Sequence, residues 1–140
     1  MISIEQLLNA LPPNFQFYHL GEVKINSTPS PIQDPGAIAY RIYGELSAIL
    51  ILLFDRDLDH SIYSELGNII VSQLSHRIST ETGLELMVSS PQFLNADQLQ
   101  RLNQSNCLKL SRSYGHFFQN SVIPLEAVIL AATLEEIVYV

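Results

Sequence analysis

A glutamate and an asparagine stand three residues apart, at Glu65 and Asn68, within a long stretch that contains no proline. Residues three apart on an α-helix share one face, so this carboxylate and this carboxamide can reach the same point outside the helix. An amide both donates and accepts hydrogen bonds, whereas a carboxylate accepts them or pairs with a cation. The pair can therefore act together on one group that another molecule presents.

A long helix over residues 59–80 is predicted to carry this pair. Asp59 is a typical N-cap, and Gly83 suits the position just past the last turn. At about 100° per residue, one side of the helix gathers apolar residues with one glutamine among them: Ile62, Leu66, Ile69, Ile70, Gln73 and Leu74. The opposite side carries Ser61, Ser64, Glu65, Asn68, Ser72 and Ser75. We expect Leu66, Ile69 and Ile70 to be buried, and Glu65 and Asn68 to point outward.

Four serines beside one Glu and one Asn make a low polar surface that another molecule can approach closely. An ordinary solvated face more often carries Lys, Arg and Glu in i,i+4 pairs. By spacing alone, however, a solvated Glu and Asn without a function is the commoner interpretation, because many helices carry such a pair. The pattern of four residues therefore needs support from its surroundings.

The surroundings resemble the CheC/CheX/FliY family of bacterial chemotaxis phosphatases. The motif helix of that family reads like Glu-Ile-Gly-Asn-Ile and leads through Thr-Gly-Leu and a strand to Ser-x-Pro or Ser-Pro. The corresponding segments here are Glu65-Leu66-Gly67-Asn68-Ile69, Thr82-Gly83-Leu84 and Ser89-Ser90-Pro91. The similarity covers about residues 59–95 and contains one copy of the motif, as in the shorter CheX-like members. The connection from Phe54 to Asp59 is shorter than in that family, which normally has another helix there.

The resemblance implies a phosphatase that hydrolyses the aspartyl phosphate of a CheY-like response regulator. Asn68 would orient the attacking water and Glu65 would engage the regulator's active-site Lys. Contact with the partner would involve small residues, Ser61, Ser64, Gly67, Ser72 and Ser75. The regulator would supply the Mg²⁺, so no cofactor of the protein's own is expected, and CheX-like relatives imply a homodimer. The alternative is a non-catalytic member of the fold that binds a signalling partner or dimerises.

Composition narrows the class of protein. The chain has 140 residues, 47% of them hydrophobic and 15% charged, which indicates one domain over residues 1–140 with a substantial core. A formal net charge of −7 argues against nucleic acid and against an anionic membrane surface. Cys107 is the single cysteine, so no internal disulfide can form. With neither a signal peptide nor a spanning segment expected, we predict a cytoplasmic protein.

The remaining elements predict an α+β domain with an antiparallel or mixed sheet, against which the motif helix and shorter helices pack. Ser3 and Gln6 form a predicted capping box that opens a short helix, and Asn95 with Gln98 caps another that runs to about residue 104. Strands are expected at 15–25, 37–43, 47–54, 84–88, 107–118 and 121–132, with a loop over 26–36. The strand at 47–54 is apolar on both faces, which favours a central position. Pro124 favours an edge or bulge in its part of the last strand.

Other chemistries fit the sequence less well. Asp55, Asp57 and Asp59 resemble the start of a calcium loop, but His60 replaces the required glycine and Leu66 the final glutamate. An acidic turn with a helix cap is therefore expected. The sequence contains no glycine-rich phosphate loop. The four histidines lack the spacing of metal ligands: His19, His60, His76 and His116. A small-ligand-binding domain has no support beyond the apolar content.

Overall fold

One curled antiparallel sheet organises the molecule, as the computed structural model shows for residues 3–26, 31–104 and 109–130. Within these residues eight strands form it, in the order β1-β2-β7-β8-β4-β3-β5, while β6 also pairs with β3. They are β1 (Asn14–Gln16), β2 (Glu22–Ile25), β3 (Pro35–Gly44), β4 (Ala48–Asp55), β5 (Leu86–Val88), β6 (Gln92–Leu94), β7 (Lys109–Phe118) and β8 (Ser121–Leu130). Every pairing is antiparallel, which confirms the predicted α+β class.

Strand β4 lies inside the sheet, between β3 and β8, and both of its faces are buried as predicted. Its even-numbered residues, such as Leu50 and Leu52, belong to the main core under the long helix. Its odd-numbered residues, Ile49 and Ile51, belong to a second core on the other face. The sheet therefore separates two hydrophobic layers, because successive side chains of a strand point to opposite faces.

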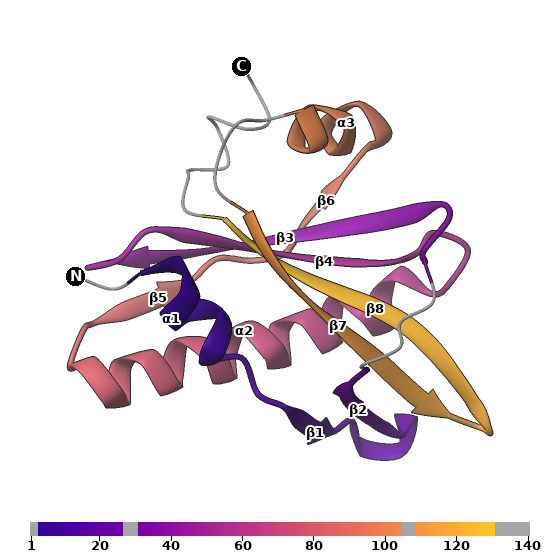
Figure 1. Ribbon diagram of the computed structural model, residues 1–140, viewed down its shortest axis with the longest axis horizontal. Coiled ribbons are helices and arrows are strands. Elements are labelled where there is room, and N and C mark those ends of the chain that lie inside the picture. Colours follow the sequence, from indigo (N-terminus) through magenta and orange to yellow (C-terminus); the bar gives the residue numbers. More distant parts are fainter. Residues whose placement is uncertain (1–2, 27–30, 105–108, 131–140) are drawn as a thin grey trace.

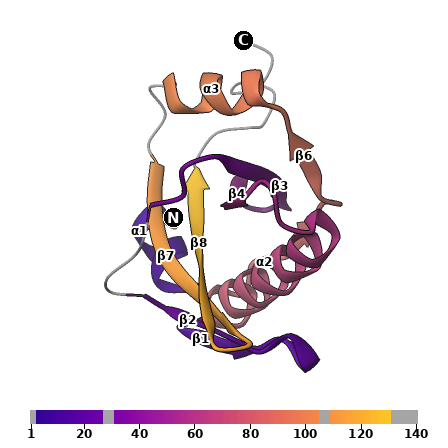
Figure 2. The same cartoon turned by 90° about the vertical axis from the view of Figure 1, so that its right-hand side faces the viewer.

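Helices cover both faces of this sheet. The long helix α2 (His60–Thr82) and the short α1 (Ile4–Asn9) contribute to the main core, whereas α3 (Ala96–Gln104) packs on the second core. Figures 1 and 2 show α2 crossing one side of the β3–β4 hairpin and α3 lying on the other. The predicted caps are present: Ser3 with Gln6 forms the capping box of α1, and Asn95 with Gln98 makes the same reciprocal pair before α3.

The prediction of one strand over residues 15–25 is wrong. The segment contains β1, a 3₁₀ turn η1 (Tyr18–Leu20) and β2, and the two strands pair with each other. Gly21 makes the reversal possible, because its φ is +88° and a Cβ there would lie 2.1 Å from the carbonyl oxygen of Phe117. The aromatic and β-branched composition of the segment is thus divided between the two arms of a small hairpin. The strand β6 was not predicted at all.

The last two strands, β7 and β8, form the predicted antiparallel pair, which lies inside the sheet between β2 and β4. Pro124 faces Gly115 of β7, while the ladder between β8 and β4 stops at Glu126. The part of β8 that contains the proline therefore has β7 on one side only, which confirms the predicted edge position. Cys107, and positions 131 and 132 of the predicted last strand, lie outside the described residues.

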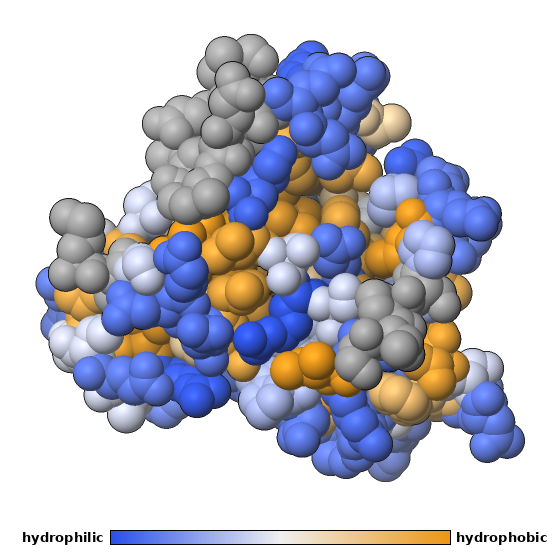
Figure 3. Space-filling model, viewed as in Figure 1, coloured by the Kyte–Doolittle hydropathy of each residue, from blue (hydrophilic) through white to orange (hydrophobic). Residues whose placement is uncertain are grey.

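The surface of α3 is hydrophilic, and hydrophobic side chains appear below it, where the sheet lies (Figure 3). Among the helices of the described residues, none combines the length and apolar character needed to cross a membrane.

Asp59 begins α2, and replacing it by alanine is expected to destabilise the protein. Its Oδ1 accepts hydrogen bonds from the backbone N–H of Ser61 at 2.9 Å and from the Ser61 hydroxyl at 2.7 Å. These bonds hold the pKa of the Asp59 carboxyl below its usual value. At pH 7, Asp59→Ala should lower the melting temperature by about 3–5 °C, whereas Asp59→Asn, which keeps an acceptor, should change it less.

The pH dependence of this effect has a defined direction. Because the pKa of Asp59 is lower in the folded than in the unfolded protein, its contribution is present at neutral pH and is lost as the pH falls through the folded pKa. The wild type and Asp59→Ala should thus converge in acid, as followed by circular dichroism during thermal melting. Equal melting temperatures at pH 7 would contradict a capping role.

Candidate functional site

Helix α2 presents Glu65 and Asn68 outward, as predicted. It starts at the Asp59 cap and ends at Gly83, whose φ of +76° places it in the left-handed region. Its buried residues are Tyr63, Leu66, Gly67, Ile70, Val71, Leu74 and Ile78. Leu66 and Ile70 are fully buried, and Ile69 is half-buried at the margin of the core. Glu65 and Asn68 are both exposed, as predicted. The buried side is rotated from the predicted one, because Gln73 is exposed whereas Tyr63 and Val71 are buried.

The two polar side chains are neighbours that are not engaged with the rest of the protein. Three residues advance an α-helix by about 4.5 Å, so their side chains emerge side by side. Within the described residues, neither side chain makes a hydrogen bond or an ion pair with another residue. The carboxylate and the amide are therefore both available to an incoming group.

The serines around the pair do not all have the same freedom. Ser61 and Ser72 are exposed, while Ser64 and Ser75 are half-buried. The Ser61 hydroxyl donates to Asp59, and the Ser75 hydroxyl donates to the carbonyl oxygen of Ser72 at 3.1 Å. Two of the four hydroxyls thus already have partners inside the protein, and the shared property of the four is their small size.

Gly67 lies on the buried side of α2, which corrects its assignment to the partner-facing surface. A Cβ at this position would lie 2.2 Å from the hydroxyl oxygen of Tyr40 and 2.5 Å from two of its ring carbons. Tyr40, on β3, is completely buried, and its hydroxyl donates to the backbone oxygen of Ser64 at 2.6 Å. Burial raises the pKa of Tyr40 to about 12, so the phenol remains a donor at neutral pH. The glycine therefore allows the helix to approach the sheet, rather than allowing a partner to approach the helix.

A second tyrosine ties the start of α2 to the opposite strands. The Tyr63 hydroxyl lies 3.1 Å from Nδ1 of His116, a residue of β7 that is 2% exposed. The other ring nitrogen, Nε2, contacts the carbonyl oxygen of Leu20, which can only accept. In the neutral imidazole Nε2 therefore carries the proton, and Nδ1 accepts from Tyr63. Burial and the charge of Asp55 raise the pKa of Tyr63 to about 12, which keeps this hydroxyl protonated.

The acidic segment before α2 is a turn with a helix cap, as expected. Asp55 accepts a hydrogen bond from the backbone N–H of Asp57 at 3.0 Å, while Asp59 accepts from Ser61. In the part of the chain that the structure describes, no three His, Cys, Asp or Glu side chains come together in a way that could hold a metal ion.

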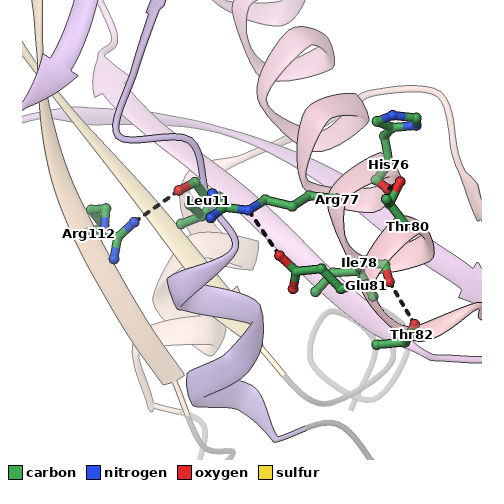
Figure 4. A network of polar contacts seen from close by, with 8 residues as sticks. All are labelled: Leu11, His76, Arg77, Ile78, Thr80, Glu81, Thr82 and Arg112. Carbon is green, nitrogen blue, oxygen red and sulfur yellow. Dashed lines mark hydrogen bonds and ion pairs between the residues drawn. The ribbon is translucent and has the colours of Figure 1, made fainter.

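A hollow of about 410 Å³ lies away from the pair, between the end of α1 and the C-terminal half of α2. Its walls include Ala10, Pro12, His76, Arg77 and Thr80. Figure 4 shows this region: Arg77 pairs with Glu81 at 3.3 Å, and Arg112 donates to the carbonyl oxygen of Leu11 at 3.2 Å. Neither Glu65 nor Asn68 lines the hollow. The pair stands on an exposed helix face, where a group presented by another molecule can reach it.

Sequence reasoning missed an aromatic contact at the first residue of the motif helix. His60 stacks on Phe93 of β6, with ring centroids 5.9 Å apart and an interplanar angle of 15°. The signal was weak, because the three residues of β6 stand between Pro91 and Asn95 and are too few to show a period. Only the pairing with β3 identifies this segment as a strand.

Comparison with known proteins found similarity in structure only. The chain matches no protein-family model and no curated protein. It is similar to a chain of the crystal structure of the CheX–CheY–BeF3–Mg²⁺ complex from Borrelia burgdorferi, with 13% identity and a TM-score of 0.49, over 92% of this chain and 93% of that one.

Two further solved structures are similar. A chemotaxis protein CheX from Desulfovibrio desulfuricans has 10% identity and a TM-score of 0.43, over 76% of this chain and 81% of that one. A CheC-like superfamily protein from Shewanella has 11% identity and a TM-score of 0.42, over 78% of this chain and 81% of that one. The chain is thus structurally similar to CheX and CheC-like superfamily proteins over most of its length, at low sequence identity.

Proposed function

We propose that the protein is a phosphatase that hydrolyses the aspartyl phosphate of a CheY-like receiver domain, with Glu65 and Asn68 as its catalytic pair. The observation that carries the proposal is the exposure of these two unengaged side chains, side by side, on the helix whose sequence resembles the CheC/CheX motif. The non-catalytic binding module remains the alternative, and the assay below separates the two.

The proposed reaction requires placement rather than covalent chemistry by this protein. A water molecule attacks phosphorus, and the bond between phosphorus and the aspartyl oxygen breaks. The products are inorganic phosphate and a free aspartate carboxylate on the receiver. Such reactions are accelerated mainly by in-line positioning and by stabilisation of charge on the phosphoryl oxygens. The receiver brings the phosphorylated Asp, the Mg²⁺ and a Lys, so the protein needs no cofactor of its own.

Each side chain of the pair suits one task. The Asn68 amide accepts a hydrogen bond from the attacking water and donates one to a phosphoryl oxygen, without adding negative charge beside the phosphate. The Glu65 carboxylate pairs with the receiver's Lys and sets the register of the two proteins. The small Ser64 and Ser72 on the same side leave room for the receiver's active-site loops to approach α2.

The exposed position of the pair supports a protein substrate. Sites for small molecules are typically concave and bury most of the ligand, whereas Glu65 and Asn68 are exposed and line no part of the hollow beside α1. A receiver domain supplies the missing walls of the site when it docks. The assembled site then excludes bulk water, which strengthens the hydrogen bonds to the phosphoryl group.

The direct test measures loss of phosphate from labelled receiver domains of the same organism, with and without this protein at substoichiometric concentration. The expected result is a shorter half-life of the phosphorylated receiver, with several phosphates released per molecule of the protein. An unchanged half-life despite measurable binding would contradict the phosphatase proposal and favour the non-catalytic binding module.

Glu65→Ala is expected to weaken both binding and turnover. The charge-assisted contact with the receiver's Lys serves docking and alignment together, so affinity and rate should each fall about tenfold. Glu65→Gln, which keeps the shape and loses the charge, should recover only part of the affinity. Glu85→Ala removes another exposed carboxylate and should behave like wild type. Wild-type affinity and rate in Glu65→Ala would show that Glu65 takes no part in the proposed site.

A further inference from the structure

A series of aromatic rings leads from the core to the surface at the start of α2. The buried Tyr63 stacks on Phe54 of β4 with centroids 5.0 Å apart, and Phe54 meets His60 edge-on at 5.1 Å. His60 then stacks on Phe93 at 5.9 Å. Its Nε2 donates to the backbone oxygen of Arg56 at 2.9 Å, which fixes the plane of the imidazole. The series thus ends on Phe93, whose ring stacks on His60, and His60 is in turn packed against Phe54.

Phe93 is exposed, yet it is held in place. In β6 it follows Gln92 and precedes Leu94, and Leu94 is buried in the core beneath α3. Because alternate residues of a strand point to opposite faces, Phe93 points to the side of the sheet that carries α2. There 49% of its surface remains exposed. An aromatic ring fixed before binding loses little conformational entropy when a partner covers it.

Phe93 stands next to the row of α2 residues that ends at Asn68. His60, Ser64 and Asn68 follow one another at intervals of four, so each is the surface neighbour of the next along the helix. Eight residues span about 12 Å along the axis, so His60, on which the Phe93 ring stacks, stands about two turns before Asn68. A typical interface covers about 800 Å² per partner, or about 30 Å across. An interface centred on Asn68 therefore extends about 15 Å along α2, which reaches the turn of His60 on which Phe93 stacks.

We infer that Phe93, backed by His60, is an apolar contact by which the phosphorylated receiver docks beside Glu65 and Asn68. The inference rests on the proposed function and adds a specificity-determining residue to it. The receiver contributes an exposed aliphatic or aromatic side chain near its phosphorylation site, which the Phe93 ring covers. Aromatic side chains are enriched among the residues that dominate binding energy at interfaces. Since Phe93 lies away from the reacting atoms, it affects affinity and leaves the chemical step unchanged.

The test combines kinetics with direct binding for Phe93→Ala. The substrate is a phosphorylated CheY-like receiver, and binding is measured with the same receiver loaded with beryllofluoride and Mg²⁺. KM and Kd are expected to rise about tenfold, while kcat stays within about twofold. Phe93→Leu keeps an apolar side chain and should restore most of the affinity. Thermal melting should show that both variants are folded.

Met87→Ala is the matched control. Met87 is 54% exposed and pairs with Tyr43 of β3. Tyr43 shares its face of the strand with Ala37 and Ala39, which belong to the core beneath α3, so Met87 points away from α2. Its removal should change neither KM nor Kd, although it deletes a comparable exposed apolar side chain.

The possible outcomes separate this inference from the proposed function. Acceleration by the wild type together with unchanged KM and Kd in Phe93→Ala would overturn the inference and leave the phosphatase. Binding without acceleration would overturn the phosphatase, while a higher Kd in Phe93→Ala would still support the docking contact. A wild type that neither binds nor accelerates would overturn both. Loss of a dimer in Phe93→Ala, with unchanged affinity for the receiver, would assign the ring to a second copy of this chain and overturn the inference.

Discussion

Replacement of Asn68 by alanine is expected to lower the rate of receiver dephosphorylation by about a hundredfold, while the affinity for the receiver changes little. In the proposed function the amide aligns the attacking water and contacts the phosphoryl group as charge develops, so its loss would act on the transition state. Removal of one such polar contact typically costs 10²–10³ in rate, and each factor of ten corresponds to about 1.4 kcal/mol in the barrier. The measurement is kcat from phosphate release at saturating receiver, with Kd for the beryllofluoride-loaded receiver measured in parallel.

Asn103→Ala is the control for this substitution. Asn103 is an exposed asparagine on α3, which packs on the opposite face of the sheet. Both alanine variants should be folded, because exposed substitutions usually shift stability by less than about 0.5 kcal/mol. If Asn68→Ala retained wild-type kcat while folded, the helix face would not be an active site, and the binding-module alternative would be preferred.

Replacement of Gly67 by alanine is expected to destabilise the protein by about 3 kcal/mol, although alanine is the better helix former. On an exposed helix position the same change would stabilise by up to about 1 kcal/mol. Here the new methyl group would meet the Tyr40 ring, with 2.2 Å to its hydroxyl oxygen. Either the ring or the helix must shift, which costs overpacking strain and weakens the hydrogen bond from Tyr40 to Ser64. Urea denaturation followed by circular dichroism measures the difference in the free energy of unfolding.

A double-mutant cycle isolates the contact. In a Tyr40→Leu background the ring atoms that meet the new methyl group are absent, so Gly67→Ala should cost much less there than in the wild type. Ser72→Ala, on the exposed side of the same helix, should leave stability within about 0.5 kcal/mol. A stabilised Gly67→Ala variant would place Gly67 outward and contradict the packing of α2 on β3.

The sequence by itself determined the features that depend on neighbours along the chain. The limits of α2 follow from an N-cap at Asp59 and a left-handed residue at Gly83. Its inner and outer faces follow from the helical period, which placed Glu65 and Asn68 outward and Leu66 inward. The caps of α1 and α3 and the β3–β4 hairpin likewise depend on residues that are close together in the sequence. Such features are predictable because residues within about four positions interact in the same way in any fold that accepts the helix or hairpin.

Only the tertiary structure decided which distant segments meet. The segment at 15–25 became a hairpin because Gly21 turns against the backbone of β7, about a hundred residues later in the chain. The three residues of β6 became a strand because β3 offered a free edge, and this pairing placed Phe93 against His60. From its place in the motif between Glu65 and Asn68, Gly67 was expected to face a partner. In the structure its neighbour is Tyr40, 27 positions earlier in the chain. Contacts of this kind depend on long-range strand pairing and close packing, which leave no periodic pattern in the sequence.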